Sequence, residues 1–407
     1  MRLLRDPRGA LIRARFALLT VAAVAGCGVI YPARPGDWVY FHTAELVLSG
    51  APGPYRIPGG PLHLYAEMPH LQMGPLAVAA TWLAERLPPH PAQLVAALVM
   101  SAFAVVIVAA LERAARYSGV PVNPWLTIIG GLIFVGAWIS VAGWWMHVDD
   151  VLALTAFALA MPSLSRGRWL LPGLLIGVAA ATKPWAIVLL PVLLTLPGRR
   201  RRFAVLAAVA AAVACWAPFL LAAPDSGRAL AGVRISVSAD STLRLMHLAG
   251  HWSPGWLRPT QFLLGIVVAS LAARRTGWAG AALCGLAVRV GLDAQTYSYY
   301  GAGLVLAALA VDLRRRSDAR LPVWTMAAAT VEYVVPAVVD GAPAAVARLA
   351  FCFAALTLLT RQPRHETVGT PPADCGSPGG HGNRASAHVP SQRADAESGI
   401  VGMAPAD

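Results

Sequence analysis

Three short stretches of the sequence carry acidic or basic side chains able to do chemistry in an otherwise apolar chain. The first contains Asp37, whose carboxylate can take a proton from an incoming hydroxyl group. The second is His147-Val148-Asp149-Asp150, which could bind a sugar hydroxyl or a divalent cation. The third is Lys183, a solitary lysine in an apolar stretch, which can bind phosphate as a point charge.

Asp37 also has a structural interpretation. It precedes a helical run that is ended by Gly50, and Asp is a preferred N-cap residue while Gly commonly ends a helix. Capping and catalysis do not exclude each other. If the run is helical, Asp37, Phe41 and Glu45 share one face, with His42 beside them.

The other two stretches have structural interpretations as well. Asp149 and Asp150 stand where a helix is expected to start, and acids there interact favourably with the helix dipole. Lys183 either faces a cavity or extends its ammonium group to the membrane surface, because a lysine facing lipid is costly. Beside Pro184 and Trp185 it would suit a lipid phosphate held at membrane depth.

The stretch from residue 34 to 75 is a polar connection of about 40 residues, and connections this long are often functional. We expect it to carry the reaction centre and to contain short interfacial helices. A second polar stretch, 223–259, supplies further cations for a phosphate. The candidate substrate-binding residues are His42, Glu45, Tyr55, His70, His147, Asp149, Asp150, Lys183, Arg234 and Arg244.

Composition places the chain among multi-pass membrane proteins. Of its 407 residues, 57% are hydrophobic and only 13% are charged, whereas soluble domains carry about 25% charged residues. Long apolar runs separated by short polar turns predict an all-α bundle of about 11–13 transmembrane spans. We expect this domain to cover residues 1–360 and to be followed by a disordered cytoplasmic tail, 361–407.

The arginines give the predicted orientation. Threading the spans places 21 of the 33 basic residues on one face and nine on the other. Basic residues are enriched on the cytoplasmic side, so both termini are predicted to be cytoplasmic in a plasma-membrane protein. The net charge of +13 is therefore a topology signal and does not indicate nucleic-acid binding.

The same threading gathers the candidate residues from at least five connections on the extracytoplasmic face, as expected of a site built on a scaffold. Glu332 and Arg348 instead fall inside the last two spans, at similar depths. We expect these two to pair with each other in a structural role, as intramembrane charges usually do.

The order of these features resembles a known family. An N-terminal span is followed by Gly36-Asp37-Trp38-Val39-Tyr40, by Gly50, Tyr55 and Pro75-Leu76, by the acidic turn 146–150, and by Lys183-Pro184 after Gly173 and Gly177. This order is similar to the GT-C superfamily of integral membrane glycosyltransferases, and most to actinobacterial mannosyltransferases that use polyprenyl-phosphate-mannose. The resemblance covers about residues 16–194, and the C-terminal half follows it only in topology.

The resemblance implies an inverting glycosyltransferase with Asp37 as catalytic base and Lys183 as a contact of the donor phosphate. It implies a polyprenyl-phosphate-linked sugar as donor, a glycan or glycolipid as acceptor, and membrane lipids as surroundings. No cofactor is expected, and a divalent cation remains an open alternative. The chain departs from the family at Gln72-Met73-Gly74-Pro75, where a Tyr-Pro-Pro-like segment is usual, and it lacks an Asp-X-Asp pair in the first connection.

Two other functions fit the composition. A transporter or flippase for a lipid-linked glycan should show internal repeats and ionisable groups near the membrane midplane. The sequence shows no repeat, and most acids lie at the predicted outer ends of the spans. A non-catalytic membrane protein is the third alternative.

Overall fold

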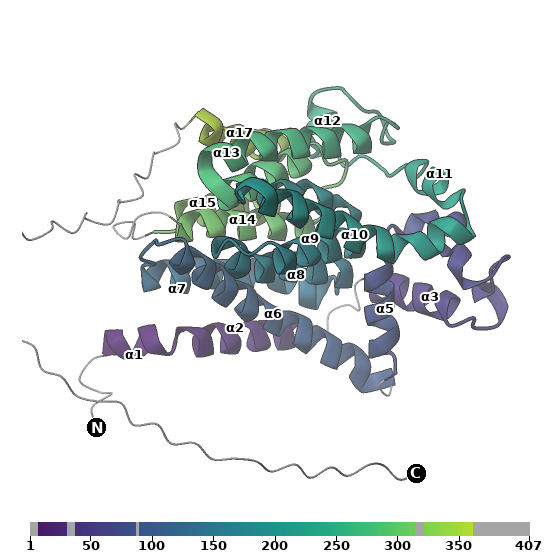
Figure 1. Cartoon of the computed structure of the whole chain (residues 1–407), viewed down its shortest axis with the longest axis horizontal. Coiled ribbons are helices and arrows are strands. Elements are labelled where there is room, and N and C mark those ends of the chain that lie inside the picture. The colour runs from purple at the N-terminus through teal and green to yellow at the C-terminus, as the bar shows by residue number, and fades with distance from the viewer. Residues whose placement is uncertain (1–6, 31–36, 87–88, 315–320, 361–407) are drawn as a thin grey trace, which may run out of the picture. The chain divides into compact units, whose positions relative to one another are not determined.

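The computed structural model describes residues 7–30, 37–86, 89–314 and 321–360, and these form a helical bundle (Figure 1). Apart from an isolated bridge between Ser236 and Trp252, the described residues contain no β-structure. The predicted all-α class is confirmed. The predicted tail, 361–407, lies outside the described residues.

Within the described residues, five helical segments are long and apolar enough to cross a membrane, judged by length and composition. Seven shorter apolar helices of 10–17 residues accompany them. This is the architecture of a helical membrane protein, whereas the predicted number of spans and their orientation stay predictions. The five segments are Gln93–Tyr117 within α6 (Pro89–Tyr117), Pro124–Trp144, Val148–Ser165 (α8), Gly198–Ala222 (α10) and Leu257–Gly291 (α13).

Other helices that matter for the packing and the site accompany these segments. In chain order they are α1 Pro7–Arg13, α2 Arg15–Ile30, α3 Trp38–Leu48, α4 Leu64–Glu67, α5 Pro75–Ala84, α7 Pro124–Ile139, the π-helix η6 Ser140–Trp144, α9 Leu170–Thr182, the 3₁₀-helix η7 Pro184–Thr195, α11 Ser226–Ala231, α12 Thr242–Leu245, the 3₁₀-turn η8 Ser298–Tyr300, α14 Gly301–Leu313, α15 Val323–Ala329, the π-helix η9 Thr330–Val334, α16 Val335–Val338 and α17 Ala342–Leu356.

Helix α13 is a hairpin of two helices, and the basic pair Arg274-Arg275 stands just before the bend. The chain bends at Gly277, whose φ of 73° and ψ of −167° lie outside the helical region. Only glycine adopts such an angle without strain. The two arms of the hairpin lie against each other. The Gln261 side-chain amide in the first arm donates a 2.6 Å hydrogen bond to the Arg289 carbonyl in the second.

Element η7 departs from the α-helical form that is expected of the apolar runs. Its 12 residues form a 3₁₀-helix that contains Pro191. At about 2.0 Å per residue it extends about 24 Å, whereas an α-helix of the same length would extend about 18 Å. The short apolar run after Lys183 therefore reaches further than its residue number suggests.

Small residues hold α9 and α10 together. A Cβ atom on Gly173 would lie 2.5 Å from the Ala204 carbonyl oxygen, and one on Gly177 would lie 2.3 Å from that of Ala208. The two glycines and the two alanines are each four residues apart, so both pairs lie on one face of their helix. Such small-residue faces let helix backbones approach closely in membranes.

The first polar connection is folded into short helices, as expected for residues 34–75, of which 34–36 lie outside the described part. Figure 1 shows α3, α5 and α11 together at one end of the bundle. The pairing predicted inside the last spans is also confirmed, because Arg348 Nε lies 3.2 Å from Glu332 Oε1 and both side chains are buried.

Candidate functional site

The segment between α7 and α8 contains the acidic turn, and its backbone sets the directions of the acidic side chains. Helix α7 ends in the π-helix η6, and Met146 follows with a φ of 51° although it is not glycine. Its side chain is fully buried, so packing holds this unfavourable backbone angle. Wide π-turns and strained backbone are both concentrated at functional sites. The turn directs His147, Asp149 and Asp150 toward each other.

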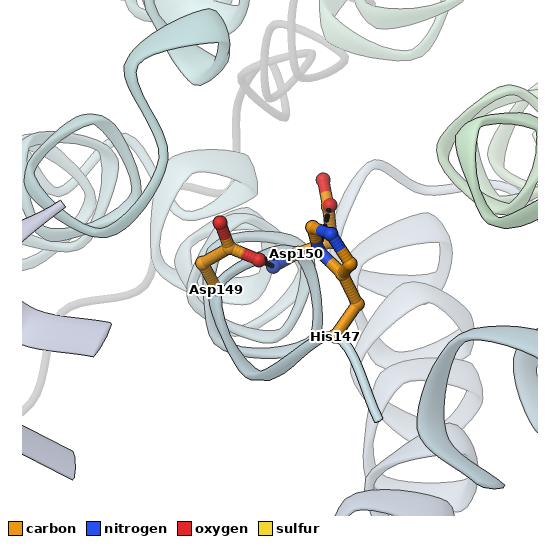
Figure 2. Close-up of side chains that lie close together, drawn as sticks. All are labelled: His147, Asp149 and Asp150. Atoms are coloured by element: carbon orange, nitrogen blue, oxygen red, sulfur yellow. Dashed lines mark hydrogen bonds and ion pairs between the residues drawn. The ribbon is translucent and has the colours of Figure 1, made fainter. Parts of the chain in front are cut away.

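His147 is the centre of a buried ion-pair network, part of which is drawn in Figure 2. Its Nδ1 lies 2.5 Å from Asp149 Oδ1 and 2.7 Å from Asp150 Oδ2. Its Nε2 lies 3.3 Å from Asp37 Oδ2, which belongs to the start of α3. The imidazole ring stacks on Tyr299 at a centroid distance of 4.1 Å. The first polar connection, the acidic turn and the segment before α14 therefore meet at one histidine.

Lys183 is the second cation of this network. Its Nζ lies 2.5 Å from Asp149 Oδ2 and 3.6 Å from Asp150 Oδ2. The indole N–H of Trp185 donates a 2.8 Å hydrogen bond to Asp150 Oδ1. Buried carboxylates therefore hold the Lys183 ammonium group in place.

The carboxylates keep both cations charged. Burial alone would lower the pKa of His147, but Asp149 and Asp150 outweigh burial and the repulsion from Lys183 and raise this pKa from 6.5 to about 10. Burial likewise disfavours charged Lys183, and the same two carboxylates raise its pKa above the ordinary lysine value. At neutral pH the imidazolium and the ammonium group are thus both positive.

A cavity of about 450 Å³ opens beside this network. Five predicted site residues line it: Asp37, His70, His147, Asp149 and Lys183. The rest of the wall is largely aromatic and polar, with Tyr40, Phe41, Gln72, Trp145, Arg258, Gln295, Tyr297, Tyr299 and Tyr300 among its residues. A second cavity of about 70 Å³ shares the Lys183, Arg258 and Tyr300 wall and adds Arg289 and Asp293.

Asp37 occupies the N-cap position of α3, yet its side chain makes no capping hydrogen bond. The carboxylate lies instead toward His147, with 21% of the side chain exposed. The backbone N–H of Asp37 donates a 2.6 Å hydrogen bond to the carbonyl of Trp145, which fixes the start of α3 beside the acidic turn. These residues therefore lie on the same side of the bundle, and Asp37 is available to a ligand in the cavity.

Gly74 ties the first polar connection to the Lys183 segment. Its N–H donates a 2.8 Å hydrogen bond to the carbonyl of Thr182, the residue before Lys183. A Cβ atom on Gly74 would lie 2.0 Å from the carbonyl oxygen of Ala181 and 2.6 Å from that of Thr182. Contacts this close exclude any side chain, so Gly74 has a structural role here.

Gly74→Ala should therefore destabilise the protein by about 1–3 kcal/mol, because backbone atoms cannot move aside as a flexible side chain can. Thermal unfolding in detergent, followed by tryptophan fluorescence, measures the effect. Gly136→Ala is the matched control, because a Cβ atom there meets nothing within 4 Å. It should leave the midpoint unchanged or raise it, since alanine favours helix over glycine. Equal midpoints for the two variants would contradict the close approach.

Six predicted substrate-binding residues do not line the cavity. Asp150 lies behind His147 and belongs to the network. His42 and Glu45 lie further along α3 and contact each other: His42 Nδ1 is 3.8 Å from Glu45 Oε2 and 3.3 Å from Oε1 of Glu85, the C-cap residue of α5. Tyr55 packs against the hydrophobic core from a 3₁₀-turn. The remaining two are Arg234 and Arg244.

Local geometry directs the side chains of Arg234 and Arg244 away from the cavity. Arg234 is exposed while its neighbour Ile235 lines the cavity, since successive side chains of an extended segment point to opposite sides. Arg244 donates a 2.8 Å hydrogen bond to the Gly250 carbonyl in its own connection. Arg258 and Arg289 supply the positive charge of the cavities instead. An arginine inside the apolar run 278–292 is the signal that could have indicated Arg289.

His147, Asp149 and Asp150 also offer one ligand atom each within 4.8 Å of one another, a possible metal-binding arrangement. Lys183 lies against the same two carboxylates, with its Nζ 2.5 Å from Asp149 Oδ2 and 3.6 Å from Asp150 Oδ2. Its ammonium group therefore already balances the charge that a divalent cation would balance.

No family model, curated protein or solved structure matches the chain. The described residues define the protein as a helical membrane protein with a buried acid–histidine–lysine network beside an aromatic cavity.

Proposed function

We propose that the protein transfers a sugar from a polyprenyl-phosphate donor to a hydroxyl group of a glycan or glycolipid, at the extracytoplasmic membrane face. The single observation that carries the proposal is the composition of the 450 Å³ cavity, where an accessible carboxylate faces several fixed cations. Glycosyl transfer from a phosphate needs a base for the acceptor and positive charge for the leaving group.

Asp37 is the group best suited to be the base. Asp149 is 1% exposed and lies against both His147 and Lys183. His147 holds its proton at neutral pH, because its pKa is raised to about 10. Asp37 is the more exposed carboxylate: 21% of its side chain is accessible, and its Oδ2 lies 3.3 Å from His147 Nε2.

The reaction is a direct displacement. The acceptor oxygen attacks the anomeric carbon, the bond from that carbon to the phosphate oxygen breaks, and the acceptor proton passes to Asp37. Polyprenyl phosphate leaves with the bonding electron pair, and one displacement inverts the anomeric configuration. Lys183 and Arg258, on the wall shared by the two cavities, are placed to stabilise the departing phosphate. The aromatic side chains offer faces on which a sugar ring can stack.

The proposal is tested with purified full-length protein in liposomes. Polyprenyl-phosphate-[¹⁴C]mannose, the donor indicated by the family resemblance, is supplied with a hydrophobic synthetic mannoside as acceptor. We expect labelled disaccharide with the anomeric configuration opposite to that of the donor, and no product from a nucleotide sugar. Failure of several polyprenyl-phosphate sugars and acceptors to give product, with stably folded protein, would contradict the proposal. Retention of configuration would contradict direct attack.

A further inference from the structure

A third cavity, of about 660 Å³, lies between α2, α6 and α8. Its α8 residues, Leu159 to Arg166, belong to the C-terminal end of that helix, whereas His147 and Asp149 stand at its N-terminal end. Helix α8 has 18 residues and is therefore about 27 Å long, close to the roughly 30 Å of a bilayer core. The cavity thus lies one membrane thickness from the candidate site, at the face predicted to be cytoplasmic.

The wall of this cavity is strongly positive. Four arginines line it together with one acid, Glu112. Glu112 is 2% exposed and fully engaged: Arg15 Nε and Nη2 donate to its two oxygens at 3.1 and 2.7 Å, and Arg116 also donates to it. The single carboxylate is used to hold α2 against α6. The cavity therefore keeps an excess of positive charge.

The other two arginines are exposed and available. Arg113 makes no ion pair with any described residue, and the Arg166 guanidinium lies 3.6 Å from the centroid of the Tyr117 ring rather than against an acid. They come from the C-terminal ends of α6 and α8, respectively. An anion entering the cavity can contact both.

Below each of these arginines lies an exposed aliphatic side chain. Val106 precedes Arg113 by seven residues and Leu159 precedes Arg166 by seven, and each is 40% exposed. Seven residues are two helical turns, so each aliphatic side chain lies on the same face as its arginine, about 10 Å further into the bilayer. The surface changes from cationic to aliphatic in the direction in which a phospholipid changes from head group to acyl chain.

We propose that this cavity binds an anionic phospholipid, with its phosphate against Arg113 and Arg166 and its acyl chains over Val106 and Leu159. Basic pockets between membrane helices suit anionic head groups. The aliphatic surface is what favours a lipid over free phosphate, which could use only the arginines. The site is separate from the sugar-transfer cavity and does not depend on the proposed reaction.

Native mass spectrometry of the delipidated full-length protein tests this site. Phosphatidylglycerol and phosphatidylcholine are titrated separately in detergent micelles, and inorganic phosphate is added as a competitor. Phosphatidylglycerol should bind at least about tenfold more tightly than phosphatidylcholine. The double variant Arg113→Gln/Arg166→Gln should lose about 30-fold in phosphatidylglycerol affinity, from the contribution of two basic residues. Arg113→Lys/Arg166→Lys keeps the charge and should retain most of the binding.

The matched control is Arg201→Gln/Arg202→Gln on α10, which removes two exposed arginines outside the cavity and should change affinity by less than about twofold. Equal binding of the two lipids would overturn the proposal, as would equal losses in the cavity and control variants. Displacement of phosphatidylglycerol by millimolar phosphate would overturn the choice of a lipid as ligand. The unfolding midpoint of each variant shows whether a loss reflects misfolding.

Discussion

Asp37→Asn should lower the rate of sugar transfer by about 10²–10⁴-fold, the contribution typical of a positioned general base. Asparagine has nearly the same shape and can still contact His147 through its amide oxygen, but it cannot accept the acceptor proton. Donor binding should change little, because Lys183 and Arg258 remain on the cavity wall. The measurement is kcat and donor KM in proteoliposomes under the conditions that give product with the unaltered protein.

The control for this variant is Asp225→Asn. Asp225 is also an acid at the start of a short helix, but its side chain is 81% exposed and it lies outside the cavity. It should retain full activity. If Asp37→Asn is folded and transfers sugar at the unaltered rate, Asp37 is not the base. A raised donor KM with unchanged kcat would instead assign Asp37 to ground-state binding.

The helices could be predicted from the sequence because long apolar runs are easily distinguished from the polar segments between them. Apolar runs are separated by arginine pairs and glycines, and the bend at Gly277 after Arg274-Arg275 is an example. Even the pairing of Glu332 with Arg348 follows from the cost of a lone charge in lipid. Helical form is the one local solution that satisfies the backbone there, so periodicity and length suffice.

The site was only partly predictable because its geometry depends on departures from regular helices. The π-turn of η6 and the positive φ of Met146 direct His147, and neither feature has a recognisable signature in the sequence. His42 and Arg234 have the right chemistry and connection but the wrong side-chain direction, which depends on tertiary packing. Arg258 belongs to the second polar stretch, 223–259, and lines the cavity although it is not among the predicted site residues.

Lys183→Met should destabilise the protein by about 3–5 kcal/mol, the usual cost of removing one partner from a buried ion pair. Lys183 is the only lysine in the chain, and its loss leaves Asp149 and Asp150, 1% and 3% exposed, with His147 as their remaining close cation. Thermal unfolding in detergent should show a markedly lower midpoint. Arg228→Met breaks a pair whose side chains are 88% and 81% exposed and should cost less than about 1 kcal/mol.

The double variant Lys183→Met/Asp149→Asn separates this structural role from a role in donor binding. Removing one negative charge together with the ammonium group should recover at least half of the lost stability, because the surplus buried charge disappears. If Lys183 also contacts the donor phosphate, the folded double variant should still show a donor KM raised about tenfold or more. Asp149→Asn alone should leave the donor KM unchanged. A folded double variant with an unchanged donor KM would leave Lys183 a purely structural partner of the acids. No recovery of stability would mean that the ammonium group is needed for more than balancing Asp149.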